Sequence, residues 1–414
     1  MTGSEHFERG PGHKAQDDGG GVAVAARSLL TAAAVRERAH EMLAIALDGG
    51  LSDWRVDLAR LPATANIVAG VIRERYPTLD VPFHARWRHF VVGGRDLWAE
   101  LAATADWPDA RAKARAAFDL AITSVLLDAG AGPRWRFLDA QTCTETSRSE
   151  GLGVASLRLF QSGALSGGED RLRADGLTGL TAAALADAFQ VSDANPLVGL
   201  DGRAALLRRL GAAVGRPGDL FDAMAARAEN GRLPAPVILE VLLERLGPIW
   251  QDRLTLGGLP LGDTWRHPAI KRDDATDGLV PIHKLSQWLA YSLIEPLEAA
   301  GITVHSLDGL TGLAEYRNGG LFIDDGVLVL KDPADMGRTH AVGDPLVVGW
   351  RSMTVALLDR IAPLVRERLG VAQADFPLAR VLEGGTWAAG RVLARERRDG
   401  GGPPLTITSD GTVF

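Results

Sequence analysis

The chain has 414 residues, and its 52 acidic and 45 basic side chains give a formal net charge of −7. Hydrophobic residues make up 46% and charged residues 23%, which is the ordinary composition of a globular protein. The single cysteine, Cys143, excludes a disulfide within these residues and any zinc or iron–sulfur site built from several cysteines. The acidic balance argues against a general nucleic-acid-binding protein.

Residues 1–21 are polar and rich in glycine, with no apolar core of a signal peptide, and we expect them to form a disordered extension. The chain contains no run of about 18 apolar residues, so no transmembrane helix is expected. One cysteine also fits a reducing compartment. We therefore expect a cytoplasmic protein that binds neither membranes nor nucleic acids.

After residue 21, apolar residues recur mostly with the spacing of amphipathic helices. Pro296 and Pro363 should end or kink the last two of these helices. The predicted helices span residues 22–47, 66–76, 109–127, 150–160, 174–189, 202–210, 236–246, 283–297 and 350–369.

Strand signals are few. Residues 321–330, with the sequence LFIDDGVLVL, match a β-hairpin with a two-residue turn, and residues 405–414 suggest a second hairpin that turns near Asp410 and Gly411. The fold class expected is mainly α with short β-hairpins (α+β). We expect one functional unit over residues 22–414, with two lobes that meet near residues 257–281.

The strong catalytic motifs are missing from the sequence: it contains no GxxxxGK[ST], HExxH or GxSxG pattern and no EF-hand loop. The nine histidines do not cluster with carboxylates at the spacing of metal ligands. We therefore expect neither a metal nor a cofactor. Polar and aromatic segments that interrupt the apolar pattern are the remaining candidates for a site.

Two such segments lie in the first half of the chain. In FHARWRHF, Arg86, Arg88 and His89 are close enough in sequence to form a corner that binds an anion, or the segment is a solvated loop anchored by Trp87. In TSRSEG, the residues after Arg148 suit the start of a helix, and Arg148 either binds substrate or forms a surface ion pair.

The predicted helix after residue 282 carries an unusual stripe. Lys284, Trp288, Tyr291 and Glu295 fall on one face, with His283 on the neighbouring face. An aromatic wall with a few polar groups is typical of a small-molecule pocket. The alternative is an amphipathic helix along which Lys284 extends to the solvent.

The densest segment is LTGLAEYRNGGLFID, in which Glu315, Tyr316, Arg317 and Asn318 are consecutive. Glu315 can act as a general base or stabilise positive charge, and Arg317 can bind an anionic group. The alternative is a structural ion pair between the two. Glu383 precedes two glycines and either reaches a pocket or is a carboxylate at the end of a helix.

These segments resemble the uracil-catabolism protein 4 family of fungi and bacteria, long treated as a domain of unknown function. The resemblance spans residues 22–414 and implies a place in a uracil-degradation route that proceeds through ribosylated intermediates and liberates urea. It rests on TSRSEGL, FQVSDANPLVGLDGRAALLRRLG, LGDTWRHP, GLVPIHKLSQWLAYSLIEPLE, LTGLAEYRNGGLFID, LEGGTWAAGR and SDGTVF.

A shorter resemblance concerns Glu315–Tyr316–Arg317, which is similar to an Asp–Tyr–Arg segment of queuosine-salvage nucleotide glycosidases. Those enzymes are mostly helical, resemble DNA glycosylases in shape and cleave N-ribosyl bonds. This chain has Glu in place of Asp, and Asn–Gly–Gly after the arginine. The resemblance implies a helical, glycosylase-like architecture with two lobes.

Together these resemblances imply a hydrolase that cleaves the N-glycosidic bond of a ribosyl- or phosphoribosyl-ureide, passing through an oxocarbenium-like centre. The partner is then a small ribosylated molecule derived from a pyrimidine, with other enzymes of the uracil pathway as possible protein partners. An amidohydrolase acting on the opened ring, or a non-catalytic scaffold or regulator, are the alternatives.

The expected catalytic residues are Glu315, with Asp263 and Asp324 in reserve, and His283 or Lys284 as the group that protonates or polarises the leaving nitrogen. Phosphate is assigned to Arg317, Arg86 and His89. Trp288 and Tyr291 are expected to form walls around the base or ureide. The remaining substrate-binding candidates are Arg148, Tyr316, Asn318 and Glu383.

Overall fold

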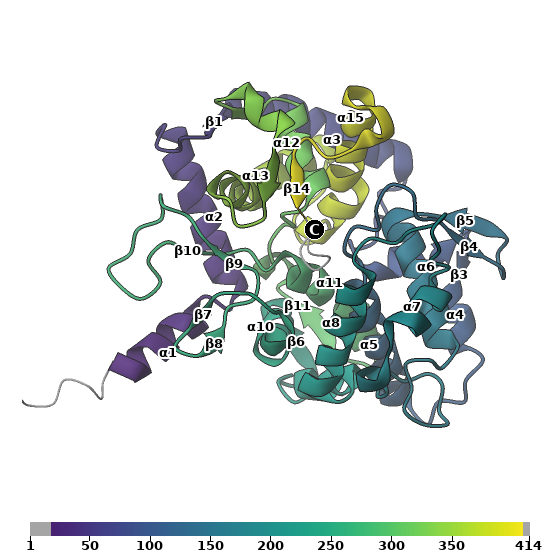
Figure 1. Ribbon diagram of the computed structural model, residues 1–414. Coiled ribbons are helices and arrows are strands. Elements are labelled where there is room, and N and C mark those ends of the chain that lie inside the picture. The colour runs from purple at the N-terminus through teal and green to yellow at the C-terminus, as the bar shows by residue number, and fades with distance from the viewer. Residues whose placement is uncertain (1–17, 409–414) are drawn as a thin grey trace, which may run out of the picture.

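Helices make up most of residues 18–408, the part of the chain that the computed structural model describes (Figure 1). The expectation of a mainly helical chain is confirmed. The helices are α1 Asp18–Ser28, α2 Ala32–Leu47, α3 Leu61–Arg75, α4 Leu97–Ala102, α5 Ala110–Leu126, α6 Arg148–Gln161, α7 Ala182–Ala188, α8 Leu200–Val214, α9 Leu220–Ala225, α10 Ala235–Leu246, α11 Lys284–Ala299, α12 Tyr316–Asp324, α13 Pro345–Leu369, α14 Leu378–Val381 and α15 Trp387–Arg397.

The strands of the described chain are short and form two-stranded sheets. Three sheets join strands that are far apart in sequence, so they tie distant helices together. The antiparallel pairs are β1 Trp54–Val56 with β12 Leu328–Leu330, β2 Val91–Val92 with β3 Arg95–Asp96, β4 Phe137–Asp139 with β5 Thr144–Thr146, β7 Thr255–Leu256 with β8 Leu259–Pro260, and β9 Thr264–Arg266 with β10 Leu279–Pro281. The parallel pairs are β6 Arg232–Pro234 with β11 Thr303–His305, and β13 Thr339–Ala341 with β14 Thr406–Thr408.

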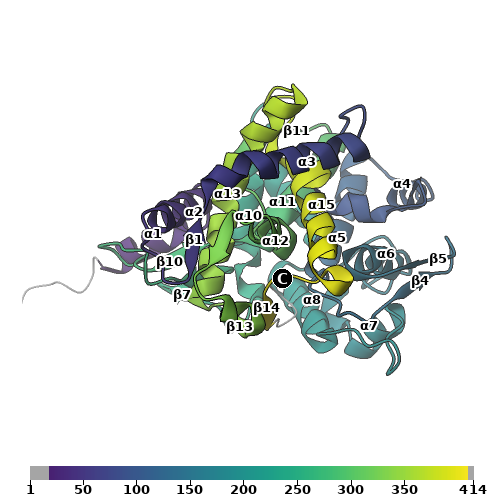
Figure 2. The same ribbon diagram turned by 90° about the horizontal axis from the view of Figure 1, so that it is seen from above.

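The helix α11 lies near the centre of the molecule. In Figures 1 and 2, α2, α3, α12, α13 and α15 gather on one side of it and α4 to α8 on the other. One continuous cluster of buried apolar side chains runs from Leu30 to Leu405 and includes residues of both groups. The lobe boundary near residues 257–281 stays a prediction.

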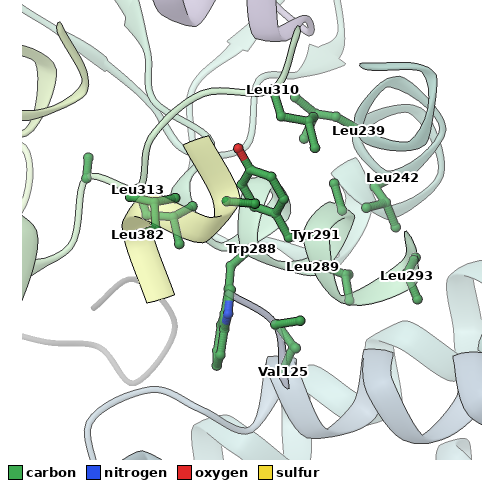
Figure 3. Close-up of a cluster of buried hydrophobic side chains, with 14 of the residues drawn as sticks. Val125, Leu239, Leu242, Trp288, Leu289, Tyr291, Leu293, Leu310, Leu313 and Leu382 are labelled. Atoms are coloured by element: carbon green, nitrogen blue, oxygen red, sulfur yellow. The ribbon is translucent and has the colours of Figure 1, made fainter. Parts of the chain in front are cut away.

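The core side of α11 holds Tyr291, which was expected to line a pocket. Its ring lies among Leu239, Leu289 and Leu310, and its hydroxyl donates to the carbonyl oxygen of Thr311 at 3.0 Å (Figure 3). Trp288 projects from α11 in a different direction in the same view. Tyr291 is therefore a core residue, because its only polar atom is satisfied inside the protein.

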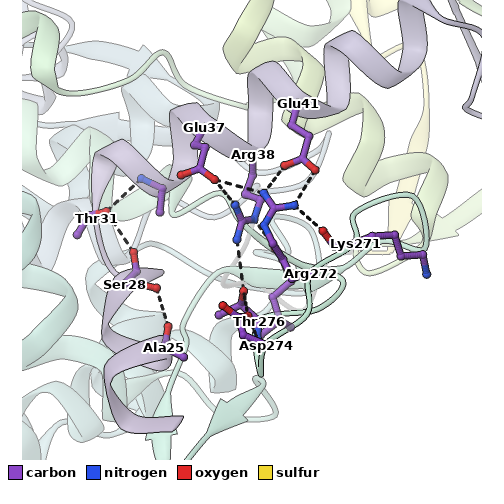
Figure 4. Close-up of polar contacts among 12 residues, drawn as sticks. Ala25, Ser28, Thr31, Glu37, Arg38, Glu41, Lys271, Arg272, Asp274 and Thr276 are labelled. Atoms are coloured by element: carbon purple, nitrogen blue, oxygen red, sulfur yellow. Dashed lines mark hydrogen bonds and ion pairs between the residues drawn. The ribbon is translucent and has the colours of Figure 1, made fainter. Parts of the chain in front are cut away.

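The predicted helix over residues 22–47 is in fact two helices, α1 and α2, separated by a short break. Thr31 causes the break: its hydroxyl accepts the backbone N–H of Ala34 at 3.1 Å and caps α2 (Figure 4). Arg272 holds the loop before β10 against α2 through two hydrogen bonds to Glu41, at 2.5 and 2.8 Å. Residues 18–21 belong to α1, while residues 1–17 of the expected disordered extension lie outside the described residues.

The hairpin predicted for residues 321–330 is wrong. Leu321 to Asp324 form the last turns of α12, and only Leu328–Leu330 is a strand, which pairs with β1 instead. A short apolar run does not distinguish strand from helix. Here Glu315 decides the outcome, because its carboxylate caps α12 and starts the helix just before the run.

Of the second predicted hairpin, the structure describes only the first strand, β14, which pairs in parallel with β13. The turn expected at Asp410 and Gly411 lies outside the described residues. Both helices with an internal proline continue past it, α11 for three residues beyond Pro296 and α13 for six beyond Pro363.

The other predicted helices are present with shifted ends, except the one over residues 174–189. That segment contains only the short α7, because Thr181 caps a helix that starts eight residues later than expected. The segments predicted as 109–127 and 236–246 differ from α5 and α10 by one residue at an end. Their long apolar repeats explain this agreement.

Candidate functional site

A cavity of about 350 Å³ lies beside the N-terminus of α12 and receives side chains from distant parts of the chain. Its volume lies within the range of small-molecule sites. The lining residues are His84, His89, Asp128, Gly130, Ala131, Gly132, Pro133, Arg148, Ser149, Glu150, Leu152, Lys284, Trp288, Leu313, Glu315, Tyr316, Arg317, Trp387, Arg391, Gly401, Gly402 and Pro403.

The cavity brings together predicted site residues from four sequence segments, with residues 284–288 on α11 and residues 315–317 at the start of α12. Because residues 84–89 and 148–152 come from still other elements, the meeting of these segments is a property of the fold rather than of the local sequence. The predicted residues that line the cavity are His89, Arg148, Lys284, Trp288, Glu315, Tyr316 and Arg317. Their roles stay predictions.

Glu315 lies directly before α12, and its carboxylate caps that helix. One oxygen accepts the backbone N–H of Arg317 at 2.7 Å and the other accepts that of Asn318 at 2.5 Å. Burial raises the pKa of Glu315, and the charge of Lys284 and the two N–H groups only partly oppose this. Each oxygen keeps one lone pair, so Glu315 can both cap the helix and face a ligand.

Lys284 is the first residue of α11 and shares the cavity with Glu315. Its ammonium nitrogen lies 5.7 Å from the centroid of the Trp288 ring. Burial lowers the pKa of Lys284, although the charge of Glu315 acts in the opposite direction. An amine and a carboxyl group whose pKa values are shifted towards each other are suited to acid–base chemistry.

Aromatic rings form one wall of the cavity. Trp288 stacks against His84 with 6.1 Å between the ring centroids and meets the edge of His89 at 5.8 Å. Trp387 lies 5.8 Å from His84 and 6.5 Å from His89. The two tryptophans therefore enclose the two histidines, and this wall can stack on a planar group of a ligand.

Three arginines also line the cavity and give it positively charged groups. Arg148 donates to the carbonyl oxygen of Gly400 at 2.9 Å, and Arg317 donates to that of Gly401 at 2.7 Å. Arg391 pairs with Glu150 at 2.5 Å. A guanidinium group has five donors, so each of these arginines keeps donors for an anionic ligand. Arg148 also has a φ of +55°, a rare conformation for a residue other than glycine.

Arg86 was expected to bind phosphate, but it lies behind the cavity wall and is fully buried. It donates to Asp128 at 2.7 Å and to Nδ1 of His89 at 3.0 Å. Burial and the charge of Arg86 lower the pKa of His89 to about 4. His89 is therefore neutral near pH 7 and, with Nδ1 accepting from Arg86, carries its proton on Nε2.

The α6 helix comes very close to this group because it contains glycine at residue 153. A Cβ atom there would lie 2.8 Å from the Cβ of His89. Ser149, also on α6, donates its hydroxyl hydrogen to Asp128 at 2.9 Å. The close approach thus places the start of α6 and the Arg86–Asp128 pair against the same wall.

Asp263 and His283 were both predicted to be catalytic, but neither lines the cavity. Asp263 forms two hydrogen bonds of 2.8 Å with Arg351 and accepts the indole N–H of Trp265 at 2.6 Å. His283 is fully buried, and its Nε2 lies 2.9 Å from the carbonyl oxygen of Leu29. Both residues fix the start of α11 and do not reach a ligand in the cavity.

Asp324 and Asn318 are also outside the lining. Asp324 forms two hydrogen bonds of 2.6 Å with Arg398, so its carboxylate is already paired. Asn318 is buried and donates to the carbonyl oxygen of Leu313 at 3.1 Å. These side chains hold α12 in place, which the sequence could not distinguish from binding to a ligand.

Glu383 does not line the cavity. It accepts a hydrogen bond from Nδ1 of the lining residue His84 at 2.7 Å. It belongs to the π-helical turn η8, Leu382–Thr386. Burial alone would raise the pKa of Glu383, but the hydrogen bond and the charge of His84 outweigh it and hold the pKa below 4.5. Glu383 therefore positions His84 rather than a ligand.

Glu383→Gln should lower the free energy of unfolding by roughly 1–3 kcal/mol at neutral pH, since a buried charge-assisted hydrogen bond is weakened. A carboxyl group whose folded pKa is lowered stabilises the protein above its unfolded pKa, and this stability is lost as the pH falls through the folded value. The difference from the wild type should therefore shrink as the pH falls below the usual range of a glutamate carboxyl group.

Urea unfolding at several pH values measures this difference. Glu367→Gln is the matched control, because its side chain is 77% exposed and its ion pair with Arg368 is 4.0 Å long. The control should change stability by no more than about 0.5 kcal/mol. A Glu383→Gln deficit that stays constant down to pH 3 would contradict the assigned interaction.

Sequence reasoning missed several lining residues, among them His84, Asp128, Glu150, Trp387 and Arg391. One signal was available: Trp387 and Arg391 are four residues apart on α15, and the guanidinium carbon lies 4.7 Å from the ring centroid. Asp128 gave no local signal, because it follows an ordinary apolar helix and its partners, Arg86 and Ser149, are distant in sequence.

The sequence profile of a family described as "Protein of unknown function (DUF1688)" matches residues 28–414 of this chain. The chain belongs to this family. A relative named "Protein urg3", from Schizosaccharomyces pombe, is 38% identical over 403 residues, which cover 93% of this chain and 98% of the relative. "Uracil catabolism protein 4" from Lachancea kluyveri is 37% identical over 414 residues, covering 89% of this chain and 93% of the relative. The family resemblance expected from the sequence is therefore confirmed.

The match to the DUF1688 family includes every segment that contributes to the cavity. No helix in the described part of the chain is long and apolar enough to cross a membrane. Within residues 18–408, no three His, Cys, Asp or Glu side chains are grouped as they would be to hold a metal ion.

Proposed function

We propose that this member of the DUF1688 family acts in uracil catabolism and hydrolyses the N-glycosidic bond of a ribosyl- or phosphoribosyl-ureide. The observation that carries the proposal is the meeting of Glu315, Lys284, Trp288 and Arg317 in one cavity. The pathway comes from the relative named "Uracil catabolism protein 4". A glycosylase-like architecture with two lobes is part of the same proposal.

The chemistry of the reaction requires a carboxyl group beside the sugar. Breaking the bond between C1′ and the ureide nitrogen leaves positive charge on C1′ and the ring oxygen, and it needs a proton on the leaving nitrogen. Burial raises the pKa of Glu315, which favours a proton donor near neutral pH. Once ionised, the same carboxylate stabilises the positive centre and accepts a proton from attacking water.

Different walls of the cavity suit the two parts of such a substrate. The planar ureide suits the wall formed by Trp288 and Trp387, which stack on π systems. A 5′-phosphate suits Arg148 and Arg317, because guanidinium groups bind phosphate through paired hydrogen bonds. The N-terminus of α6 opens on the same side, and Ser147 does not cap it with its side chain.

The test is to incubate the purified protein with ribosylurea and with phosphoribosylurea and to follow the products by mass spectrometry. The proposal expects free urea together with ribose or ribose 5-phosphate. The ratio of the two rates measures how much the arginines contribute through a phosphate.

Two other outcomes would overturn the proposal. Ammonia and carbon dioxide without free urea would indicate an amidohydrolase that cuts the C–N bonds of the ureide itself. No turnover of either compound or of the ring-opened intermediate, with binding to another enzyme of the pathway, would indicate a scaffold or regulator.

A further inference from the structure

In the part of the chain that the structure describes, Lys284 is an amine without a polar partner, in a cavity that offers several. Within the described residues, its ammonium nitrogen has neither an ion pair nor a hydrogen bond, although Glu315 lines the same cavity. The ammonium nitrogen lies over the face of Trp288, 5.7 Å from the ring centroid. A lysine that serves only to neutralise a buried carboxylate would be expected in direct contact with it.

Hydrogen bonds hold the backbone around Lys284 in place. Its N–H donates to a carboxylate oxygen of Asp263 at 2.9 Å, and Arg351 holds the same carboxylate with two hydrogen bonds. The preceding residue, His283, has a φ of +49°, a costly conformation for a side chain of this size. Strain of this kind is common at functional sites, where the surrounding structure maintains it.

The surroundings of Lys284 favour its neutral form. It lies in the first turn of α11, where the partial positive charge of the helix disfavours another cation. The tryptophan face excludes water on one side, and the charge of Asp263 is balanced by Arg351. Burial lowers the pKa of Lys284 accordingly, and the charges of Glu315 and Asp128 only partly reverse this effect. A neutral amine is a nucleophile, whereas an ammonium group is not.

We propose that Lys284 is the nucleophile of the reaction and forms an imine with C1′ of the sugar. This inference rests on the proposed function and replaces direct attack by water with two steps. The structural basis is an unpaired amine that faces a cavity shared with a carboxyl group, on a backbone that is held in place from behind.

The steps balance without any other reactant. The lone pair of Nζ forms a bond to C1′, the bond from C1′ to the ureide nitrogen breaks, and that nitrogen takes a proton from the carboxyl group of Glu315. The sugar ring then opens as its ring oxygen takes a proton from Nζ, which leaves a protonated imine. Water adds to C1′, Glu315 accepts its proton, and loss of the amine releases the sugar and free Lys284.

The experiment traps the imine by reduction. The full chain is incubated with phosphoribosylurea and sodium cyanoborohydride, and separately with ribose 5-phosphate and the same reductant. Peptide mass spectrometry then locates the reduced sugar. Lys271, which is exposed, provides an internal comparison. Lys284 lines the cavity and Lys271 does not, so a sugar bound there should label Lys284 more than about tenfold faster than Lys271.

Variants separate the inference from the proposed function. Lys284→Arg preserves a long basic side chain but cannot form an imine, so it should lose both the adduct and urea release, while Lys271→Arg should keep both. Urea release at the wild-type rate by Lys284→Arg, with no adduct on the wild type, would overturn the covalent route and leave the hydrolase intact. Failure of the wild type to release urea would instead overturn the proposed function.

Discussion

Glu315→Gln is expected to lower the rate of urea release from phosphoribosylurea by about 10²–10⁴-fold, the usual contribution of general acid–base catalysis. The amide cannot donate a proton as an acid or accept one as a base. Its carbonyl oxygen can still accept one of the two backbone N–H groups that Glu315 binds, so α12 should remain folded. We expect a loss of stability of about 1 kcal/mol from the weakened cap. Steady-state kinetics and thermal unfolding measure the two effects separately.

Asp324→Asn is the matched control, because Asp324 belongs to the same helix and was a reserve candidate for the catalytic carboxylate. Its carboxylate pairs with Arg398 and does not line the cavity. The variant should lose stability and keep the wild-type kcat per folded molecule. A larger loss of kcat in Asp324→Asn than in Glu315→Gln would transfer the catalytic role to Asp324.

Gly390→Ala is expected to destabilise the protein by about 2–4 kcal/mol. Gly390 lies where α15 crosses α12, and a Cβ atom there would overlap the carbonyl oxygen of Arg317. The overlapping atom belongs to the backbone, so relief requires one helix to move away from the other. That movement would also displace Glu315 and Arg317 from the cavity, and both urea unfolding and substrate binding should report it.

Gly70→Ala gives the opposite expectation and serves as the control. Gly70 is exposed on α3, and a Cβ atom there would have nothing within 4 Å. Alanine favours the helix more than glycine does, so stability should rise by about 0.5–1 kcal/mol. Equal effects of the two substitutions would show that the crossing of α12 and α15 tolerates more space than the structure indicates.

Long helices with a regular apolar repeat were predictable from the sequence, whereas the short element that carries the site was not. The repeat in α5 defines its ends almost to the residue. In α12 the sequence Leu321–Phe322 suits a strand as well as a helix, and the choice depends on the cap that Glu315 provides. Over such a short segment the apolar pattern does not distinguish a strand from a helix, and the local cap by Glu315 decides between them.

The lining of the candidate cavity was predictable where unusual polar residues follow one another in sequence, as from Glu315 to Arg317. It was not predictable where a residue acquires its role from a distant partner. Glu383 looked like a ligand-binding residue, but its partner is His84, 299 positions away. Asp263 looked like a catalytic acid, but Arg351 is paired with it, 88 positions away. Sequence spacing carries no information about such pairs.

Gly401 to Pro403 close one side of the cavity, so a chain growing on the ribosome carries no complete cavity until these residues have been made. Before then, Arg148 and Arg317 lack the carbonyl oxygens of Gly400 and Gly401 that hold them. Strand β1 is synthesised early but has no strand to pair with until β12 has been made. Fragments released by premature termination before residue 401 would thus lack the complete site, and any capacity for chemistry arises only after Pro403 has been made.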